Sequence, residues 1–173
     1  MYIKPFNSYY GCERCIIKGR WENRVVFSSD RLHALRTDES FNNFEYKEHQ
    51  TRLSSLVEVG VSCINGFPLD YMHLVCLGVV KRILMFYKQG PRECRLSQQQ
   101  LSILSNNLVR LKGKMTREFA RQPRSLYFLD TWKATEFRQF LLYTGPLVLK
   151  SVLKDETNNH FLSLTVALSF LLD

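Results

Sequence analysis

Residues 68–90, PLDYMHLVCLGVVKRILMFYKQG, form the stretch that decides the fold of this chain. Asp70 stands where an N-cap acceptor belongs, and the pair Gly90-Pro91 ends the helical pattern. The stretch therefore predicts one helix of about five turns. Its buried face is expected to carry a row of apolar residues: Leu74, Leu77, Val80 and Leu84.

Asp70 and His73 both fall in the first turn of this helix, at a spacing that places their side chains on one face. A carboxylate and an imidazole in this position can bind a metal ion, relay a proton or cap the helix. The residues alone favour the cap, because an aspartate here satisfies a free backbone N–H group.

The chain before this helix predicts little regular structure. Within residues 16–27, two short β-branched or aromatic runs flank residues 19–23 and predict a hairpin. The pair Thr37-Asp38 is expected to cap a helix over residues 39–50. His33 and His49 lie in polar surroundings, so both are expected to face solvent.

After residue 90 the pattern becomes helical. Ser97 and Gln100 form a capping box that opens a helix ending at Gly113. One face of this helix carries the leucines Leu101, Leu104, Leu108 and Leu111.

Three more helices are expected in the remaining sequence. Residues 131–146 predict a helix that ends at Gly145-Pro146, and residues 148–154 predict a short one. Asn158 or Asn159 is expected to cap the last helix. The fold class predicted is mainly α, a helical bundle with a small β-hairpin at its front.

Two parts are expected, a knuckle, hairpin and loop segment over residues 1–66 and a helical bundle over residues 67–173. The first residues show no helix start, and the chain stops inside the apolar run FLSLTVALSFLLD. These features predict a fragment in which the two parts form one incomplete domain.

Composition places the chain among intracellular globular proteins. Of its 173 residues, 45% are hydrophobic and 23% are charged, values typical of a soluble domain. No apolar run approaches the ~20 residues of a membrane span, and the N-terminus lacks the apolar core of a signal peptide. The count of 5 cysteines is odd, which argues against a secreted disulfide scaffold.

The net charge of +8 favours an anionic partner, and DNA is preferred over a merely solvated basic surface. The excess of basic residues falls in the middle of the chain. The candidate DNA-binding residues are Lys81, Arg82, Lys88, Arg110, Lys112, Lys114, Arg117, Arg121 and Arg124.

Cys12 and Cys15 form a C-x-x-C motif followed by the hairpin pattern, as in a zinc knuckle. Two thiolates supply half of a tetrahedral zinc site, and a redox pair or two packed thiols fit the same spacing. His160 stands at the start of the last expected helix, where its position alone indicates a surface histidine.

Four blocks in one order carry a family resemblance: YYGCERC (9–15), RTDESF (36–41), PLDYMHL (68–74) and WKATEFR (132–138). They resemble the transposases of animal CACTA-like elements, in the CMC group of cut-and-paste transposons. That group is similar in plan to the V(D)J recombinase, in which a long helical insertion interrupts an RNase H-like catalytic core of DDE type. The resemblance implies that this chain contains that insertion region.

The resemblance also implies roles for particular residues. Cys12, Cys15 and His160 match zinc ligands, and Thr165 stands where the family has a fourth ligand, a histidine. Asp70 and His73 match a motif close to the active site, where the histidine orients DNA. The catalytic acids that hold magnesium in the full-length family would lie before residue 1 and after residue 173.

The leading hypothesis is therefore a transposase-derived fragment that binds DNA weakly, is not an enzyme by itself and is nuclear if expressed. Self-association is expected only in the full-length protein, and no membrane partner is expected. A domesticated, non-catalytic module that binds nucleic acid or protein is the first alternative. A nuclease that uses Asp70, Asp130 or Glu136 as its own metal ligands ranks last, since only Asp70 has a histidine at a useful spacing.

Overall fold

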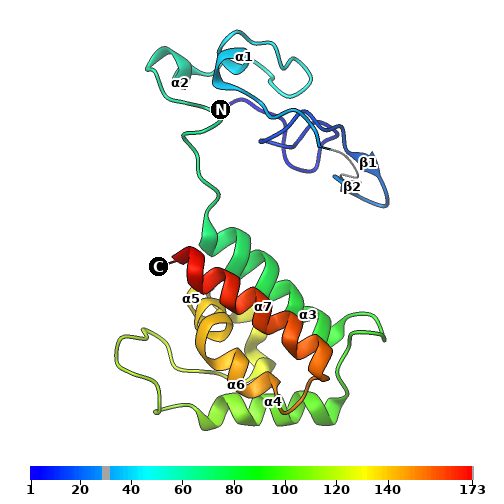
Figure 1. The fold of residues 1–173 in the computed structure, drawn as a ribbon, viewed down its shortest axis with the longest axis vertical. Helices are drawn as coiled ribbons and strands as arrows, with labels where there is room; N and C mark the ends of the chain where they lie inside the picture. Colours follow the sequence, from blue (N-terminus) through cyan, green and yellow to red (C-terminus); the bar gives the residue numbers. More distant parts are fainter. Residues whose placement is uncertain (29–31, 173) are drawn as a thin grey trace. The chain divides into compact units, whose positions relative to one another are not determined.

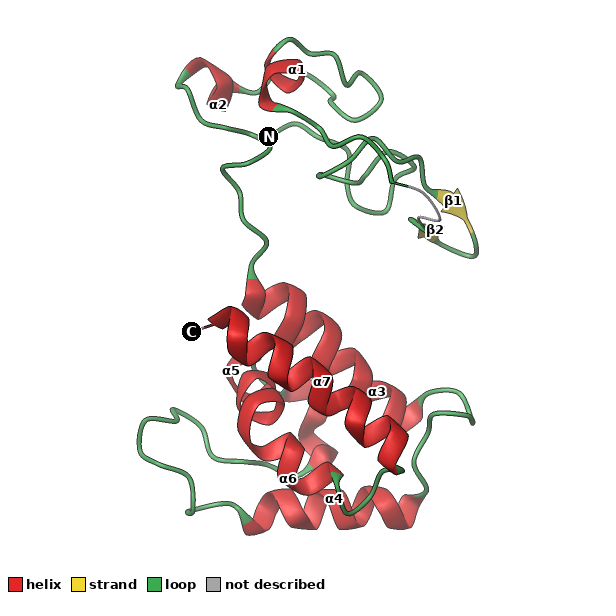
Figure 2. Ribbon diagram, viewed as in Figure 1, coloured by secondary structure: helices red, strands yellow, loops and turns green. Residues whose placement is uncertain are grey.

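The computed structural model describes residues 1–28 and 32–172, and it divides the chain into two compact units, Met1–Pro68 and Leu69–Asp173. The sequence predicts this boundary two residues earlier, between residues 66 and 67. Figures 1 and 2 show that helices make up most of the second unit and that the two short strands belong to the first. The described chain is thus mainly helical with a small N-terminal hairpin, as the sequence predicts. No helix within the described ranges is both long and apolar enough to cross a membrane.

The hairpin of the first unit pairs β1 (Arg20–Trp21) with β2 (Val25–Val26) in antiparallel register. Asn23 turns the chain between them with a φ of 58°, in the left-handed region that asparagine tolerates better than most residues. The hairpin expected within residues 16–27 is confirmed.

The helix expected over residues 39–50 is much shorter. It is α1 (Asp38–Asn42), and Thr37 caps it by accepting a hydrogen bond from the Ser40 amide at 3.2 Å. The chain leaves the helix at Phe44, whose φ of 58° lies in the left-handed region, and the Gln50 side-chain amide donates to the Phe41 carbonyl at 2.9 Å. A second short helix, α2 (Ser55–Glu58), follows.

Asp38 links α1 to residues 62–65 of the first unit through hydrogen bonds. Its carboxylate accepts hydrogen bonds from the Ser62 hydroxyl at 2.7 Å, the Ile64 amide at 2.8 Å and the Asn65 side chain at 2.8 Å. Partial burial raises the pKa of this carboxyl, but the three donors outweigh burial and hold the pKa below its usual value.

We expect Asp38→Ala to lower the free energy of unfolding of the first unit by about 1–2 kcal/mol, because three donors lose a partly exposed charged acceptor. Since the folded pKa is the lower one, this stabilisation is present above the unfolded value of about 3.9 and is lost as pH falls through the folded value. Thermal unfolding followed by circular dichroism across acidic pH measures both effects. Asp38→Asn is the control that keeps an acceptor but cannot titrate. An identical acid dependence in Asp38→Asn and the unchanged protein would refute the assignment.

Most of residues 68–90, the stretch that opens the sequence analysis, forms one continuous helix in two segments, η1 (Met72–Val80) and α3 (Lys81–Gln89). Its extent confirms the prediction, and Gly90 follows its last residue. The first segment, however, has π-helical hydrogen bonds, which close a wider turn than α-helical ones. The wider turn rotates the buried face, so Leu74 is 48% exposed and its expected core position is wrong. The buried residues are Cys76, Val80, Leu84 and Tyr87.

Helix α4 (Gln98–Arg110) begins with the predicted capping box between Ser97 and Gln100. Leu104 and Leu108 are buried, and Leu101 and Leu111 pack against the same core, which confirms the predicted leucine face. The helix lies at one end of its unit, where it packs against α6 (Gly145–Leu149) and η2 (Leu126–Thr131), a 3₁₀ helix (Figure 1).

The helix expected to end at Gly145-Pro146 continues beyond this pair. It runs through α5 (Ala134–Gln139), η3 (Phe140–Thr144, again π-helical) and α6. Pro146 is the second residue of α6 and directly follows the π-helical segment η3. A Cβ on Gly145 would lie 2.5 Å from the Phe140 carbonyl oxygen, so the glycine is needed for this close approach.

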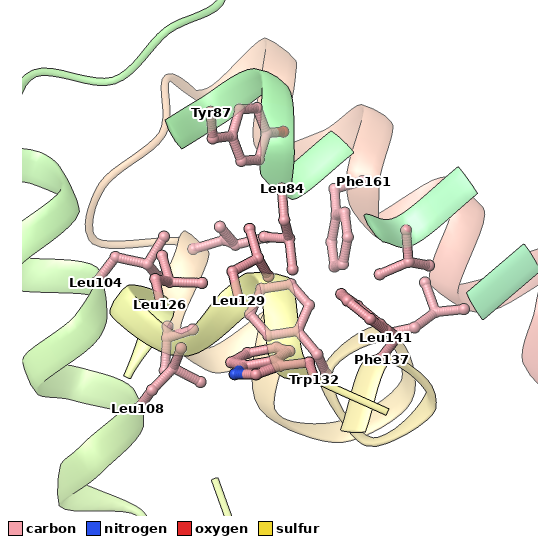
Figure 3. Packing of buried hydrophobic residues seen from close by; sticks show 14 of the residues in the cluster. Leu84, Tyr87, Leu104, Leu108, Leu126, Leu129, Trp132, Phe137, Leu141 and Phe161 are labelled. Carbon is pink, nitrogen blue, oxygen red and sulfur yellow. The ribbon is translucent and has the colours of Figure 1, made fainter. Parts of the chain in front are cut away.

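Helix α7 (Asp155–Leu172) starts earlier than its expected cap at Asn158 or Asn159, and the acidic pair Asp155 and Glu156 occupies its first turn. Phe161 fixes this helix to the rest of the unit through an edge-to-face contact with Phe140, with ring centroids 5.8 Å apart. Figure 3 shows the common core. It joins residues from most helices of the unit: Leu84, Leu104, Leu108, Leu126, Leu129, Trp132, Phe137, Leu141 and Phe161.

Candidate functional site

The structure brings the two cysteines of the C-x-x-C motif together in the first unit. Their sulfur atoms lie 3.3 Å apart, and both are free thiols. Arg36 stabilises the turn that contains the two cysteines, because its Nε donates to the Cys12 carbonyl at 3.1 Å. Two sulfurs at about 2.3 Å from a tetrahedral zinc would be ~3.8 Å apart, so the pair needs little movement to bind one ion.

The two thiols differ in acidity. Burial raises the pKa of Cys12, but hydrogen bonds from the Cys15 and Arg14 backbone, together with the Arg36 charge, bring it below its usual value. Burial and the neighbouring Cys12 sulfur raise the pKa of Cys15. Cys12 is therefore the more acidic thiol of the pair, and the thiolate is the form that binds metals.

The other two positions of the expected zinc site lie on α7, in the second unit. His160 is exposed in the second turn of the helix, whereas Thr165 is buried. The Thr165 hydroxyl bonds to the Leu141 carbonyl at 3.0 Å and to the Phe161 carbonyl at 3.2 Å. Five residues rotate an α-helix by about 140° beyond one full turn, so positions 160 and 165 face different sides. Thr165 thus serves the packing of α7. Within residues 1–28 and 32–172, no three or more His, Cys, Asp or Glu side chains are grouped as a metal site.

His49 is a site residue that sequence reasoning missed, since it was expected to face solvent. It is buried, and its Nδ1 bonds to the Tyr10 carbonyl at 2.7 Å. Burial lowers its pKa, so the ring is neutral and Nδ1–H is the donor. This bond fixes the chain just before Cys12. His33 is exposed, as expected.

Asp70 and His73 contact each other at the start of η1, as their spacing predicts. The His73 Nδ1 bonds to one carboxylate oxygen of Asp70, and the other oxygen accepts from the Met72 amide at 2.8 Å. The bond to His73 is the main cause that lowers the pKa of Asp70. Both side chains are more than half exposed. The pair therefore caps the helix in a position open to solvent.

The other two acids of the nuclease hypothesis are engaged with basic residues. Asp130 pairs with Lys88 at 3.0 Å. Glu136 is buried and accepts from Arg124 at 2.6 and 2.9 Å and from the Lys133 amide at 2.9 Å. Glu136 is therefore closed to a hard cation, which prefers several oxygen ligands, whereas Asp130 is 62% exposed and uses one oxygen for Lys88.

These ion pairs also separate the candidate DNA-binding residues into those paired with an acid and those that are not. Arg124 neutralises the buried Glu136, so it belongs to the fold rather than to a phosphate-binding surface. Lys88 is mostly covered and faces Asp130. The remaining candidates lie on α3 and around the end of α4, and all but the half-buried Lys81 are exposed: Lys81, Arg82, Arg110, Lys112, Lys114, Arg117 and Arg121.

Four of these exposed residues lie on one connection between α4 and η2, here called the basic loop: Lys112, Lys114, Arg117 and Arg121. The loop is closed on itself by a hydrogen bond from the Gly113 amide to the Gln122 side chain at 3.0 Å. The Gln139 side chain of α5 donates to the Arg121 carbonyl at 3.1 Å and anchors its far end. The fold thus places four cations on one long connection, residues 111–125, that is anchored by these two hydrogen bonds.

Comparisons with protein families, with curated proteins and with solved structures find no match for this chain.

Proposed function

We propose that this chain is a transposase-derived, nucleic-acid-binding protein without a catalytic centre of its own. The observation that carries nucleic-acid binding is the basic loop, which presents four cations and is anchored by two hydrogen bonds. The transposase origin rests on the resemblance of the four sequence blocks. A nuclear location follows from a DNA-binding role. The pairing of Asp130 with Lys88 and of Glu136 with Arg124 supports the non-catalytic part of the proposal.

The physical basis is electrostatic. DNA phosphates carry condensed counterions, and each phosphate neutralised by a lysine or arginine releases counterions into solution. The chain has a formal net charge of +8, so its long-range field also favours polyanions. Such contacts carry no sequence information, and we expect weak binding with little sequence preference.

A charge-removal experiment tests the proposal. The triple variant Lys112→Ser, Lys114→Ser, Arg117→Ser should bind a labelled DNA duplex at least about tenfold more weakly than the unchanged chain, a difference of about 1.4 kcal/mol. The matched control removes three exposed lysines elsewhere in the same unit: Lys133→Ser, Lys150→Ser, Lys154→Ser. Fluorescence anisotropy at low salt measures both. An equal loss in the two variants would contradict a role for the basic loop and favour the alternative, a protein-interaction module.

The thiol pair supports a second proposal, that Cys12 and Cys15 supply two ligands to a zinc ion. A zinc ion would compete with the proton on Cys15 and stabilise the turn held by Arg36. Zinc content after purification, compared between the unchanged chain, Cys12→Ser and His160→Ala, shows which residues bind it. If Cys12→Ser retains its full zinc content, Cys12 and Cys15 are not the zinc ligands.

A further inference from the structure

Two pockets lie next to each other along α4 in the second unit. One, of about 510 Å³, is lined mainly by residues 120–125, together with Val109 near the end of α4, Lys112, Phe128 and Glu136. The other, of about 560 Å³, is lined by the N-terminal half of α4 and the last turn of α3. Ser125 lines both, so the two pockets adjoin at this residue, and together they are here called the groove.

Each pocket has one aromatic ring in its wall. Tyr127 lines the second pocket and is 80% exposed, and Phe128 lines the first and is 50% exposed. Their rings contact each other edge to face, with centroids 5.3 Å apart and planes at 86°. Two adjacent, exposed rings of this kind offer flat apolar faces to a ligand.

The aromatic pair is rigidly supported. The Ser105 hydroxyl on α4 accepts from the Leu126 amide at 3.0 Å and contacts the Ser125 hydroxyl at 3.0 Å. Ser125 in turn caps η2 by accepting from the Tyr127 amide at 3.1 Å. Leu126 and Leu129 are buried in the core on either side of the rings. A preformed platform loses little conformational freedom when a ligand binds.

The charge around the groove is positive. Lys112 and Arg121 of the basic loop line the pocket of Phe128. The only carboxylate among the lining residues of that pocket, Glu136, is neutralised by Arg124. The pocket of Tyr127 contains Lys88, whose charge is paired with Asp130, and neutral amide and hydroxyl side chains, so the free positive charge lies in the pocket of Phe128.

We infer that this groove binds single-stranded nucleic acid. Bases stack on Tyr127 and Phe128, while the backbone phosphates lie against Lys112 and Arg121 of the basic loop. Exposed aromatic faces in a cationic groove are the general means by which proteins bind single strands, because every base presents a π-face. A duplex keeps its bases stacked and cannot use the rings. This inference rests on the proposed function and specifies its ligand.

Two labelled probes distinguish the groove from the general charge effect: a single-stranded oligo-dT and a mixed-sequence duplex. The double variant Tyr127→Ala, Phe128→Ala should bind the single strand about tenfold more weakly or worse and the duplex unchanged. Phe170→Ala, which removes a 79% exposed ring from α7, is the control and should change neither. Tyr127→Phe keeps the ring and should retain single-strand binding. Circular dichroism confirms that each variant is folded.

The outcomes separate the two proposals. If the basic-loop triple variant weakens binding to both probes but the aromatic double variant weakens neither, the groove inference is overturned and the proposed function stands. If the unchanged chain binds the duplex but not the single strand, the groove inference is overturned as well. If it binds neither probe at low salt, the proposed function itself is wrong.

Discussion

Replacing Arg124 with alanine is expected to lower the free energy of unfolding of the second unit by about 3 kcal/mol. The Glu136 side chain is only 3% exposed, and Arg124 bonds to both of its oxygens. Without the guanidinium, a carboxylate remains buried with the Lys133 amide as its other hydrogen-bond donor. We take the low end of the usual range for buried pairs because the Arg124 side chain is 36% exposed.

Chemical denaturation of Arg124→Ala and Arg117→Ala measures this effect, since Arg117 is an exposed cation of the same part of the unit. The double variant Arg124→Met, Glu136→Met should recover most of the stability, because it removes both charges at similar volume. Equal denaturation midpoints for Arg124→Ala and Arg117→Ala would show that the buried Glu136 carboxylate does not need Arg124 for the stability of the unit.

Phe161→Ala is expected to destabilise the second unit by about 3–5 kcal/mol, the usual effect of deleting a buried phenylalanine ring. The ring is 3% exposed and packs on Phe140 beneath Gly145, so its loss leaves a cavity where α7 meets η3. Thermal and denaturant unfolding give the magnitude.

Phe170→Ala is the matched control on the same helix, because its ring is 79% exposed and its removal should change stability by less than about 0.5 kcal/mol. Similar losses in Phe161→Ala and Phe170→Ala would mean that α7 is not packed on the rest of the unit as described.

Helix starts could be predicted from the sequence because capping is local chemistry. Thr37 and the Ser97–Gln100 box cap their helices as expected, each through groups no more than three residues apart. Helix interiors were less predictable. The π-helical turns of η1 and η3 have no short sequence pattern that predicts them. In η1, Leu74 lies outside the buried face, and after η3 the helix continues beyond Gly145-Pro146.

The candidate sites also separate into contacts between residues close in sequence, which could be predicted, and contacts between distant residues, which could not. The contact between Cys12 and Cys15 follows from a spacing of three residues, and so does that between Asp70 and His73. The bond from His49 to Tyr10 spans 39 residues, and the Arg124–Glu136 pair spans 12. Such contacts depend on the tertiary fold. For this reason, His49 was assigned to solvent and Arg124 to DNA.

Salt dependence of duplex binding tests the central claim most directly. Four cations on the basic loop, each neutralising one phosphate, predict that log affinity falls with log salt concentration with a slope of about −3 to −4. Fluorescence anisotropy titrations of the whole chain, from low to physiological salt, give this slope. The predicted result is a steep, linear loss of affinity, reduced by ~1 for each basic-loop cation removed. An affinity that stays constant over this range would contradict the claim that the chain binds nucleic acid through its basic loop.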